Sequence, residues 1–193
     1  MGQTNYIFVD FENVQEKDWE RIAGKPVKVV LVLDVQQKSL PVQLVRKLLK
    51  VGSQVQLVEA KRAGRNALDM VLAHYVGAIR VKDPEGYFHI VSKDAGYDSL
   101  VGHLQDEGTF ARRHSSFSET PILMNAKERV DVVSKDLKEN TAARPKKQLA
   151  LESKIQATFG RCLSESEVAE TVQCLVRDQT VMLLDSGEVK YAA

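Results

Sequence analysis

Short apolar runs of strand length recur in the first part of this chain, and each is followed by polar or acidic residues. They lie at 6–9, 27–34, 54–60 and 86–92. Their apolar character is nearly continuous, which is typical of strands that are covered on both faces. This pattern constrains the fold more than any other feature of the sequence, because such strands need helices on either side of their sheet.

Stretches with helical periodicity separate these runs, at 39–53, 66–79 and 97–108. Apolar residues in the second stretch follow the i, i+3, i+4, i+7 spacing of an amphipathic helix. Strands that alternate with helices build a parallel sheet with helices on both faces. We therefore predict an α/β fold, with a weak fifth strand around 109–112.

The alternation stops near residue 118, and a segment with prolines and several basic residues follows. We expect a first domain at 1–125 and a linker at 126–146 that is helical around 126–138. The remaining residues, 147–193, then form a small second domain. Because about 47 residues make only a marginal core, we expect this domain to dock on the first one, on a protein partner, or on a second copy in a homodimer.

The second domain contains two helical stretches, at 147–160 and 164–180, and then a hairpin candidate at 181–193. Ser164 is followed three residues later by Glu167, which is the pattern of a capping box at the start of a helix. Helices followed by a hairpin predict a small winged-helix-like module. A plain helical appendage closed by a hairpin is the alternative.

Acidic residues stand where the topology gathers functional groups. Asp10, Asp34 and Asp94 each come at or just after the carboxyl end of a strand, the edge at which open α/β sheets bind ligands. Each acid also has a structural explanation. Asp34 could stabilise a turn, Asp69 could complete the cap of its helix, and Asp98 lies in a first helical turn, where the macrodipole favours an anion.

Several carboxylates in one cleft repel each other unless a divalent cation joins them. Oxygen ligands without cysteine or clustered histidine favour Mg²⁺ or Mn²⁺ over Zn²⁺. The two cysteines, Cys162 and Cys174, form no metal-binding pattern, and the four histidines show no ligand spacing. A metal held in this way can generate hydroxide and stabilise the transition state of phosphodiester hydrolysis.

Three segments of the chain resemble a known family. "IFVDFENV", "GRNALDMVLAHYVG" and "FHIVSKDAGYDSLVGHL" occur in the order of the motifs of the PIN-like nuclease superfamily, which includes the NYN-type ribonucleases. The resemblance covers about residues 5–115. It implies a three-layer α/β/α fold and the activity of a metal-dependent ribonuclease.

The resemblance also implies roles for single residues. Four acids would be catalytic and bind Mg²⁺ or Mn²⁺, an asparagine would support the first acid or a water, and a serine precedes the third acid. Glu12 and Asp34 keep a structural interpretation. In order, the implied residues are Asp10, Asp69, Asp94 and Asp98 as metal ligands, Asn13 as the supporting asparagine, and Ser92 as the serine.

A net charge of +1 gives no global basic field, so contact with nucleic acid must rest on local groups. Lys61, Arg62 and Arg65 precede the helix of Asp69, and Lys93 precedes Asp94. Lysine and arginine position a nucleic acid through its phosphates without reading its sequence. We expect substrate contacts from a set of four residues, with a solvated loop as the alternative for the basic ones: Ser92, Lys93, Arg65 and Lys61.

These observations predict a metal-dependent endoribonuclease that acts on RNA, most simply single-stranded RNA. The alternative is a non-catalytic PIN-like module that binds RNA or a protein. A phosphoryl-accepting receiver domain is disfavoured because the third strand offers only Glu59, and a phosphatase with the DxDxT motif is excluded by "DFENV". No apolar stretch approaches the roughly 20 residues that cross a bilayer, and the first residues lack the basic region of a signal peptide. We expect a cytoplasmic protein without a membrane partner.

Overall fold

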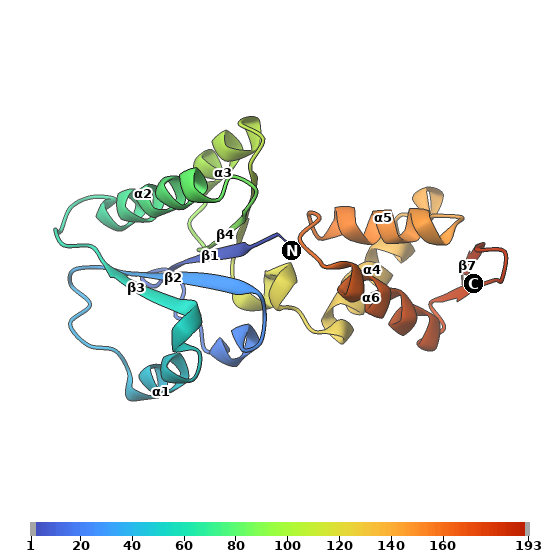
Figure 1. Ribbon diagram of the computed structural model, residues 1–193, viewed down its shortest axis with the longest axis horizontal. Coiled ribbons are helices and arrows are strands. Elements are labelled where there is room, and N and C mark those ends of the chain that lie inside the picture. Colours follow the sequence, from blue (N-terminus) through green and yellow to red (C-terminus); the bar gives the residue numbers. More distant parts are fainter. Residues whose placement is uncertain (1–2, 192–193) are drawn as a thin grey trace. The chain divides into compact units, whose positions relative to one another are not determined.

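The computed structural model describes residues 3–191, and the chain in it divides into two compact units, Met1–Leu123 and Met124–Ala193 (Figure 1). Each unit is described by itself. None of the helices in the described part of the chain is long and apolar enough to cross a membrane.

The first unit is built on a parallel sheet of five strands in the order β3-β2-β1-β4-β5. Residues with β-branched and aromatic side chains dominate these strands, and such side chains favour a pleated surface. The predicted α/β class is confirmed, and the weak fifth strand is present. The strands are β1 (Asn5–Asp10), β2 (Val27–Leu33), β3 (Val55–Glu59), β4 (Tyr87–Val91) and β5 (Phe110–His114).

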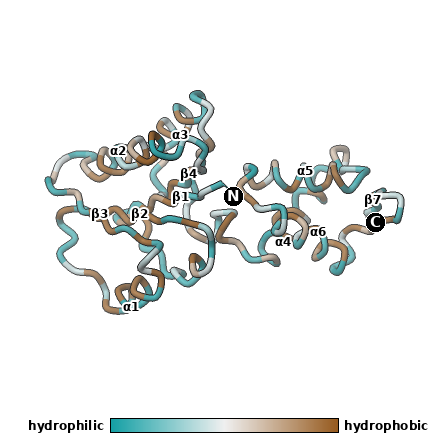
Figure 2. Tube along the Cα trace, viewed as in Figure 1, coloured by the Kyte–Doolittle hydropathy of each residue, from teal (hydrophilic) through white to brown (hydrophobic). Residues whose placement is uncertain are grey.

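Helices cover both faces of this sheet, which gives the three predicted layers. Alternate residues of β1 enter two separate cores: Ile7 packs on the side of α1 (Val42–Lys50), and Phe8 packs on the side of α2 (Ala67–Lys82) and α3 (Tyr97–Asp106). Figure 1 shows α2 and α3 on one side of the strands and α1 on the other, and Figure 2 shows hydrophobic residues along β1, β2 and β3.

The strand order places a switch point beside β1. The chain runs outward from β1 to β2 and β3, then returns to build β4 and β5 on the other side. In open α/β sheets, ligands bind in the crevice at the carboxyl ends of the two strands that flank such a point. Here those ends are Asp10 of β1 and the turn that follows Val91 of β4.

A buried polar network crosses β1, β4 and β5 within the sheet. The His89 Nε2 atom lies 2.8 Å from Asn5 Oδ1, and its Nδ1 atom lies 3.1 Å from His114 Nε2. Because the Asn5 oxygen can only accept, a neutral His89 donates from Nε2, and its Nδ1 accepts from His114. Burial lowers the pKa of both histidines, that of His114 to about 3, and the positive charge of Arg112 lowers both further.

The second unit contains three helices and a short hairpin: α4 (Ala126–Glu139), α5 (Gln148–Thr158), α6 (Glu165–Arg177), and strands β6 (Val181–Leu183) and β7 (Val189–Tyr191). The capping box at α6 is confirmed, because the Glu167 backbone nitrogen donates to Ser164 Oγ at 3.2 Å and the Glu167 carboxylate accepts from the Ser164 backbone nitrogen. An isolated antiparallel bridge between Lys147 and Glu188 connects the residue before α5 to the hairpin.

The segment 126–146, predicted as a partly helical linker, contains α4, and α4 packs against α6. The guanidinium of Arg129 in α4 is fully buried, donates to Glu170 at 2.5 Å, and donates to Thr171 at 3.1 Å. We propose on these grounds that the second domain begins at Met124 and includes α4.

Candidate active site

Carboxylates from separate segments of the first unit line one polar pocket at the carboxyl edge of the sheet. Its volume is about 330 Å³. The acids come from the loop after β1, the end of β2, the first turn of α2 and the turn after β4. The polar residues of its wall are Glu12, Asn13, Asp34, Gln36, Asn66, Asp69 and Asp94.

Asp10 is fully buried and held by hydrogen bonds from three donors. Its Oδ1 atom accepts from the Asn13 backbone nitrogen at 3.2 Å. Its Oδ2 atom accepts from Asn13 Nδ2 at 2.7 Å and from Ser92 Oγ at 3.0 Å. The chain therefore turns back at Asn13 to fix the carboxylate of Asp10, the first of the two supporting roles that we expected for Asn13.

Ser92 has a different place from the one that we predicted. Its side chain is fully buried, its hydroxyl donates to Asp10, and the same oxygen accepts from the Asp94 backbone nitrogen at 3.0 Å. A substrate cannot reach a hydroxyl that is buried and fully engaged. Ser92 instead connects the carboxylate at the end of β1 to the backbone that carries Asp94.

The Asp69 carboxylate accepts a hydrogen bond from Tyr97, a residue for which the sequence predicted no role. The Tyr97 hydroxyl lies 2.6 Å from Asp69 Oδ1. Burial raises the pKa of Tyr97 well above its usual value, and the hydrogen bond to Asp69 and the charges of Asp10 and Asp69 raise it further. Tyr97 therefore keeps its proton and orients Asp69. Asn66, at the start of α2, makes no side-chain capping bond, so the expected cap is not formed.

Asp94 is exposed and lies in the turn that leads from β4 into α3. Its Oδ1 atom accepts from the Gly96 backbone nitrogen at 2.7 Å. A Cβ atom at position 96 would lie 3.1 Å from that oxygen, which is shorter than most contacts of a Cβ atom. Gly96 thus permits the tight turn that presents Asp94 to the pocket.

Asp98 stands apart from the other acids. It does not line the pocket, and both its carboxylate oxygens accept from Arg113: Oδ1 from Nε at 2.6 Å and Oδ2 from Nη2 at 3.1 Å. The hydrogen bonds and charge of Arg113 lower the pKa of Asp98. Of the four predicted acids, Asp69 and Asp94 line the pocket. Asp10 is buried, does not line it, and is connected to the backbone of Asp94 through Ser92.

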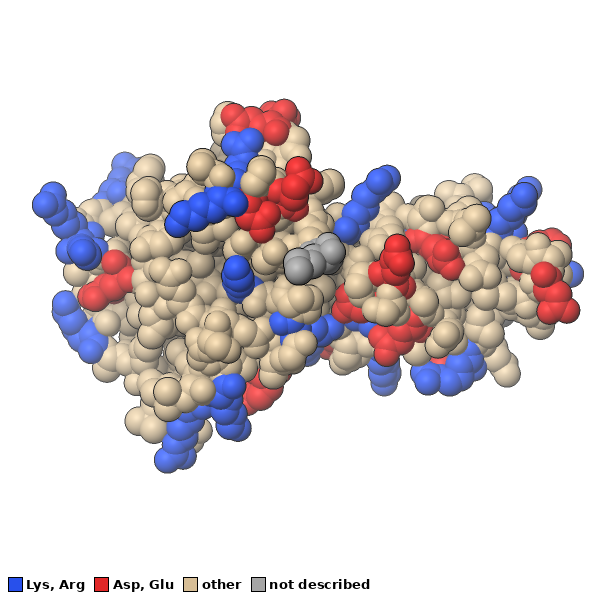
Figure 3. Space-filling model, in the orientation of Figure 1, with Lys and Arg blue, Asp and Glu red and all other residues tan. Residues whose placement is uncertain are grey.

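The predicted basic residues are exposed near the pocket. Lys61, Arg62 and Arg65 belong to the loop between β3 and α2, whose residues Ala63, Gly64 and Asn66 line the pocket wall. Lys93 is exposed beside Asp94. Within residues 3–191, none of these four side chains forms an ion pair. On the face seen in Figure 3, basic and acidic groups are interspersed, in agreement with a net charge of +1.

Two further acids line the pocket, although we gave both a structural interpretation from the sequence. Asp34 accepts from the Gln36 backbone nitrogen at 2.8 Å, as expected of a turn residue, and it also faces the pocket. Glu12 is exposed on the same wall. Two features of the sequence could have indicated their place at the pocket: Asp34 follows the end of β2, and Glu12 lies two residues after Asp10.

The pocket offers the types of ligand atom that a hard cation prefers, because its wall has carboxylate and amide oxygens and neither histidine nor cysteine. In the part of the chain that the structure describes, however, no three acidic, histidine or cysteine side chains stand close enough together to hold a metal ion. The chemistry of the wall thus fits such an ion, and its exposed carboxylates would have to turn toward it.

A three-layer fold with acids at its switch point is the arrangement of a PIN-like domain. The sequence model of the PIN domain family matches residues 4–114, and the chain belongs to this family, whose members are commonly nucleases. No curated protein and no solved structure matches the chain. The resemblance to the PIN-like superfamily is therefore confirmed, and the closer likeness to the NYN-type ribonucleases stays a prediction.

Proposed function

We propose that the chain is a metal-dependent endoribonuclease that hydrolyses phosphodiester bonds of single-stranded RNA. One observation carries the proposal: acids from separate segments of the fold line one polar pocket at the switch point between β1 and β4. A set of carboxylates at such an edge has little structural use, because their mutual repulsion is unfavourable.

The residues that would hold Mg²⁺ or Mn²⁺ are Asp69 and Asp94, with Glu12 and Asp34 on the same wall of the pocket. Asp10 is buried beside them, and its Oδ1 atom, which accepts one hydrogen bond, has a second lone pair to offer the cation. When bound, such a cation supplies a hydroxide nucleophile and neutralises charge on the phosphodiester.

The chain's own groups prepare the pocket for this chemistry. Asn13 and Ser92 hold Asp10 in one position, and the Tyr97 hydroxyl holds Asp69. Fixed groups of this kind need not reorganise during the reaction, which lowers its barrier.

The exposed bases around the pocket would position the RNA. Lys61, Arg65 and Lys93 can each neutralise a phosphate without reading a base. Cleavage should therefore depend little on sequence, and binding should weaken with salt.

The second unit offers an additional contact with RNA or protein. Its order of elements, three α-helices followed by a hairpin, supports the winged-helix-like interpretation. The basic segment 144–147 ends at Lys147, which forms an isolated bridge with Glu188 beside the hairpin.

The experiment is cleavage of labelled single-stranded RNA by the full chain with Mg²⁺, with Mn²⁺ or with EDTA. Cleavage should occur with either metal, stop with EDTA, and be lost in Asp94→Asn. The matched control is Asp106→Asn, which removes the same charge from an exposed residue at the other end of α3. If the parent binds RNA but cuts it under none of these conditions, the alternative of a non-catalytic binding module is correct.

A further inference from the structure

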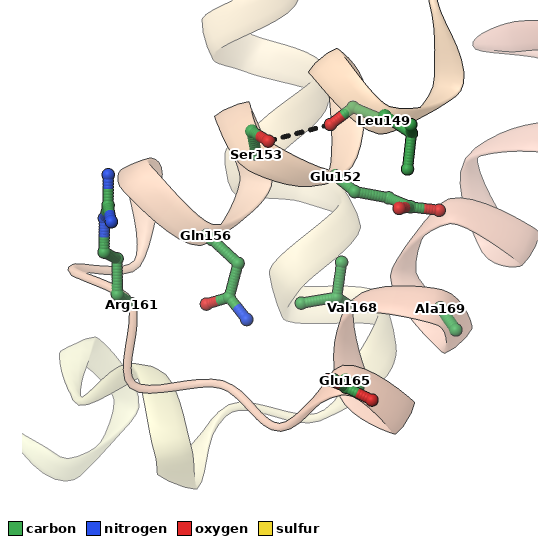
Figure 4. A pocket seen from close by; sticks show the side chains of 8 residues that line it. All are labelled: Leu149, Glu152, Ser153, Gln156, Arg161, Glu165, Val168 and Ala169. Carbon is green, nitrogen blue, oxygen red and sulfur yellow. Dashed lines mark hydrogen bonds between the residues drawn. The ribbon is translucent and has the colours of Figure 1, made fainter.

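A groove with an apolar floor and a polar, mainly acidic rim lies between α5 and α6 in the second unit (Figure 4). The groove comprises two hollows, of about 810 Å³ and 300 Å³, whose walls share Glu152 and Ala169. Val168 and Val172 make its floor, and Leu149 beside it is 76% exposed.

The charges of the groove argue against nucleic acid as its occupant. In a helix-turn-helix, the second helix lies against the negatively charged duplex. Here the second helix, α6, begins with Glu165 on the groove, and α5 contributes Glu152, whereas Arg161 at one end is the single base among the lining residues. An occupant of this groove needs an apolar stripe flanked by positive charges.

The same chain carries a helix of that description in its first unit. The helix α1 buries Leu44 and Leu48 but exposes Val42 (67%), Val45 (38%) and Leu49 (77%). The exposed residues are spaced i, i+3, i+7 and so share one face.

Basic residues accompany this stripe. Arg46 and Lys50 are exposed on α1 one position after Val45 and Leu49, and α1 contains no acidic residue. Pairing of two α1 helices would therefore bring like charges together, which disfavours a symmetric contact.

We propose that α1 of one copy docks into the groove between α5 and α6 of a second copy. The apolar stripe of α1 covers the valine floor of the groove, and Arg46 and Lys50 face Glu152 and Glu165. This contact joins two different surfaces, so it is heterologous and leads to chains or closed rings rather than to an isologous dimer. It depends on none of the residues of the nuclease pocket.

The test is sedimentation of the full chain over a range of concentrations, with single variants on each surface. The parent should associate as its concentration rises, and less so at high salt, because the flanking charges are exposed. Leu49→Glu on α1 and Ala169→Arg in the groove should each raise the dissociation constant at least about tenfold, the scale of an interface anchor. Both positions are exposed, and circular dichroism verifies that both variants fold.

A mixture of the two variants gives the decisive result. The Leu49→Glu copy keeps an intact groove and the Ala169→Arg copy keeps an intact α1, so together they should form one contact and stop at a one-to-one dimer. Val81→Glu is the control, since Val81 is 86% exposed on α2 and belongs to neither surface; it should associate like the parent.

Three outcomes would overturn the proposal. The parent remains a monomer at every concentration, or it associates while the mixed variants do not recover a dimer. In the third outcome, the parent is monomeric and the Ala169→Glu variant binds labelled RNA more weakly than the parent does. That result would assign the groove to nucleic acid. None of these measurements uses RNA cleavage. A failure of the docking proposal can therefore be distinguished from a failure of the proposed nuclease activity.

Discussion

Arg113 and Asp98 form an ion pair with two hydrogen bonds, from Nε to Oδ1 at 2.6 Å and from Nη2 to Oδ2 at 3.1 Å. The third donor of the same guanidinium, Nη1, reaches the carbonyl oxygen of Ser92 at 3.1 Å. Arg113 on β5 thus ties the end of β4 to the first turn of α3. The turn between these two points carries Asp94, so the pair fixes the position of that acid from outside the pocket.

This arrangement predicts that Asp98 positions the site and does not bind the metal. By calorimetry, Asp98→Asn should keep the Mn²⁺ affinity of the parent, whereas Asp94→Asn should lower it clearly, because it removes a ligand oxygen. Cleavage by Asp98→Asn should fall but persist, because the turn loosens. Arg113→Gln is the matched variant and should resemble Asp98→Asn. Equal losses of Mn²⁺ affinity in Asp98→Asn and Asp94→Asn would restore Asp98 to the ligand set.

Asp10→Asn and Asp94→Asn should both abolish cleavage but differ in stability. From repulsion between the acids alone, neither would be expected to destabilise the protein without metal. The structure changes this expectation for Asp10, because its carboxylate accepts from three donors and an amide NH₂ would face one of them. Asp10→Asn should lower the free energy of unfolding by about 1–3 kcal/mol, and Asp94→Asn, at an exposed residue, by less than about 0.5 kcal/mol. Urea unfolding without metal measures both, and equal values would contradict the buried network.

Tyr97→Phe removes only the hydroxyl that holds Asp69. The free energy of unfolding should fall by about 1 kcal/mol, the net value of one hydrogen bond. Cleavage should fall by roughly tenfold through kcat with little change in KM, because an acid of the site loses its orientation. Tyr75→Phe, on α2 with a half-buried ring, is the control and should behave as the parent. A change in KM alone would mean that Tyr97 acts on RNA binding instead.

The buried histidines predict a stability that falls as pH falls. Their pKa values are lowered in the folded protein, that of His114 to about 3, so below about pH 6.5 the unfolded chain binds protons that the folded one does not. The free energy of unfolding should decrease between about pH 7 and pH 5, by at most about 1.4 kcal/mol per pH unit and histidine. Urea unfolding at several pH values measures this slope. His114→Gln should flatten the slope, and substitution of the exposed His103 by Gln should not; an unchanged slope in His114→Gln would rule out the network as its source.

The sequence predicts the sheet well, because its strands follow from local patterns. Continuous apolar runs identify the buried strands, and parallel strands bring their carboxyl ends to one edge, which is why Asp10 and Asp94 could be placed together. Tyr97 and Arg113 could not be predicted, since their partners lie 28 and 15 residues away and depend on which strands are neighbours. The burial of Ser92 escaped for a related reason: its hydroxyl points along the sheet edge between two strands, which period and spacing do not reveal.

In the second unit as well, contacts between residues far apart in the sequence could not be predicted. A helix was expected around 126–138, but nothing local indicated that Arg129 would be buried against Glu170 and Thr171. A basic residue in a segment with many charges reads as solvated, and its partners come from α6, 41 and 42 residues later.

The fixed carboxylate of Asp10 has a consequence for which ions the pocket would accept. The Asp10 carboxylate is held by three hydrogen bonds before any ligand arrives, whereas Glu12 and Asp94 are exposed and Asp94 is held only by the Gly96 backbone nitrogen. Asp10, as the one rigid ligand, would set the position of the cation. The other ligands can adjust their distances to it, so the pocket would accept cations of different ionic radius. Discrimination between similar divalent ions would then fall to their supply in the cell rather than to the geometry of the protein.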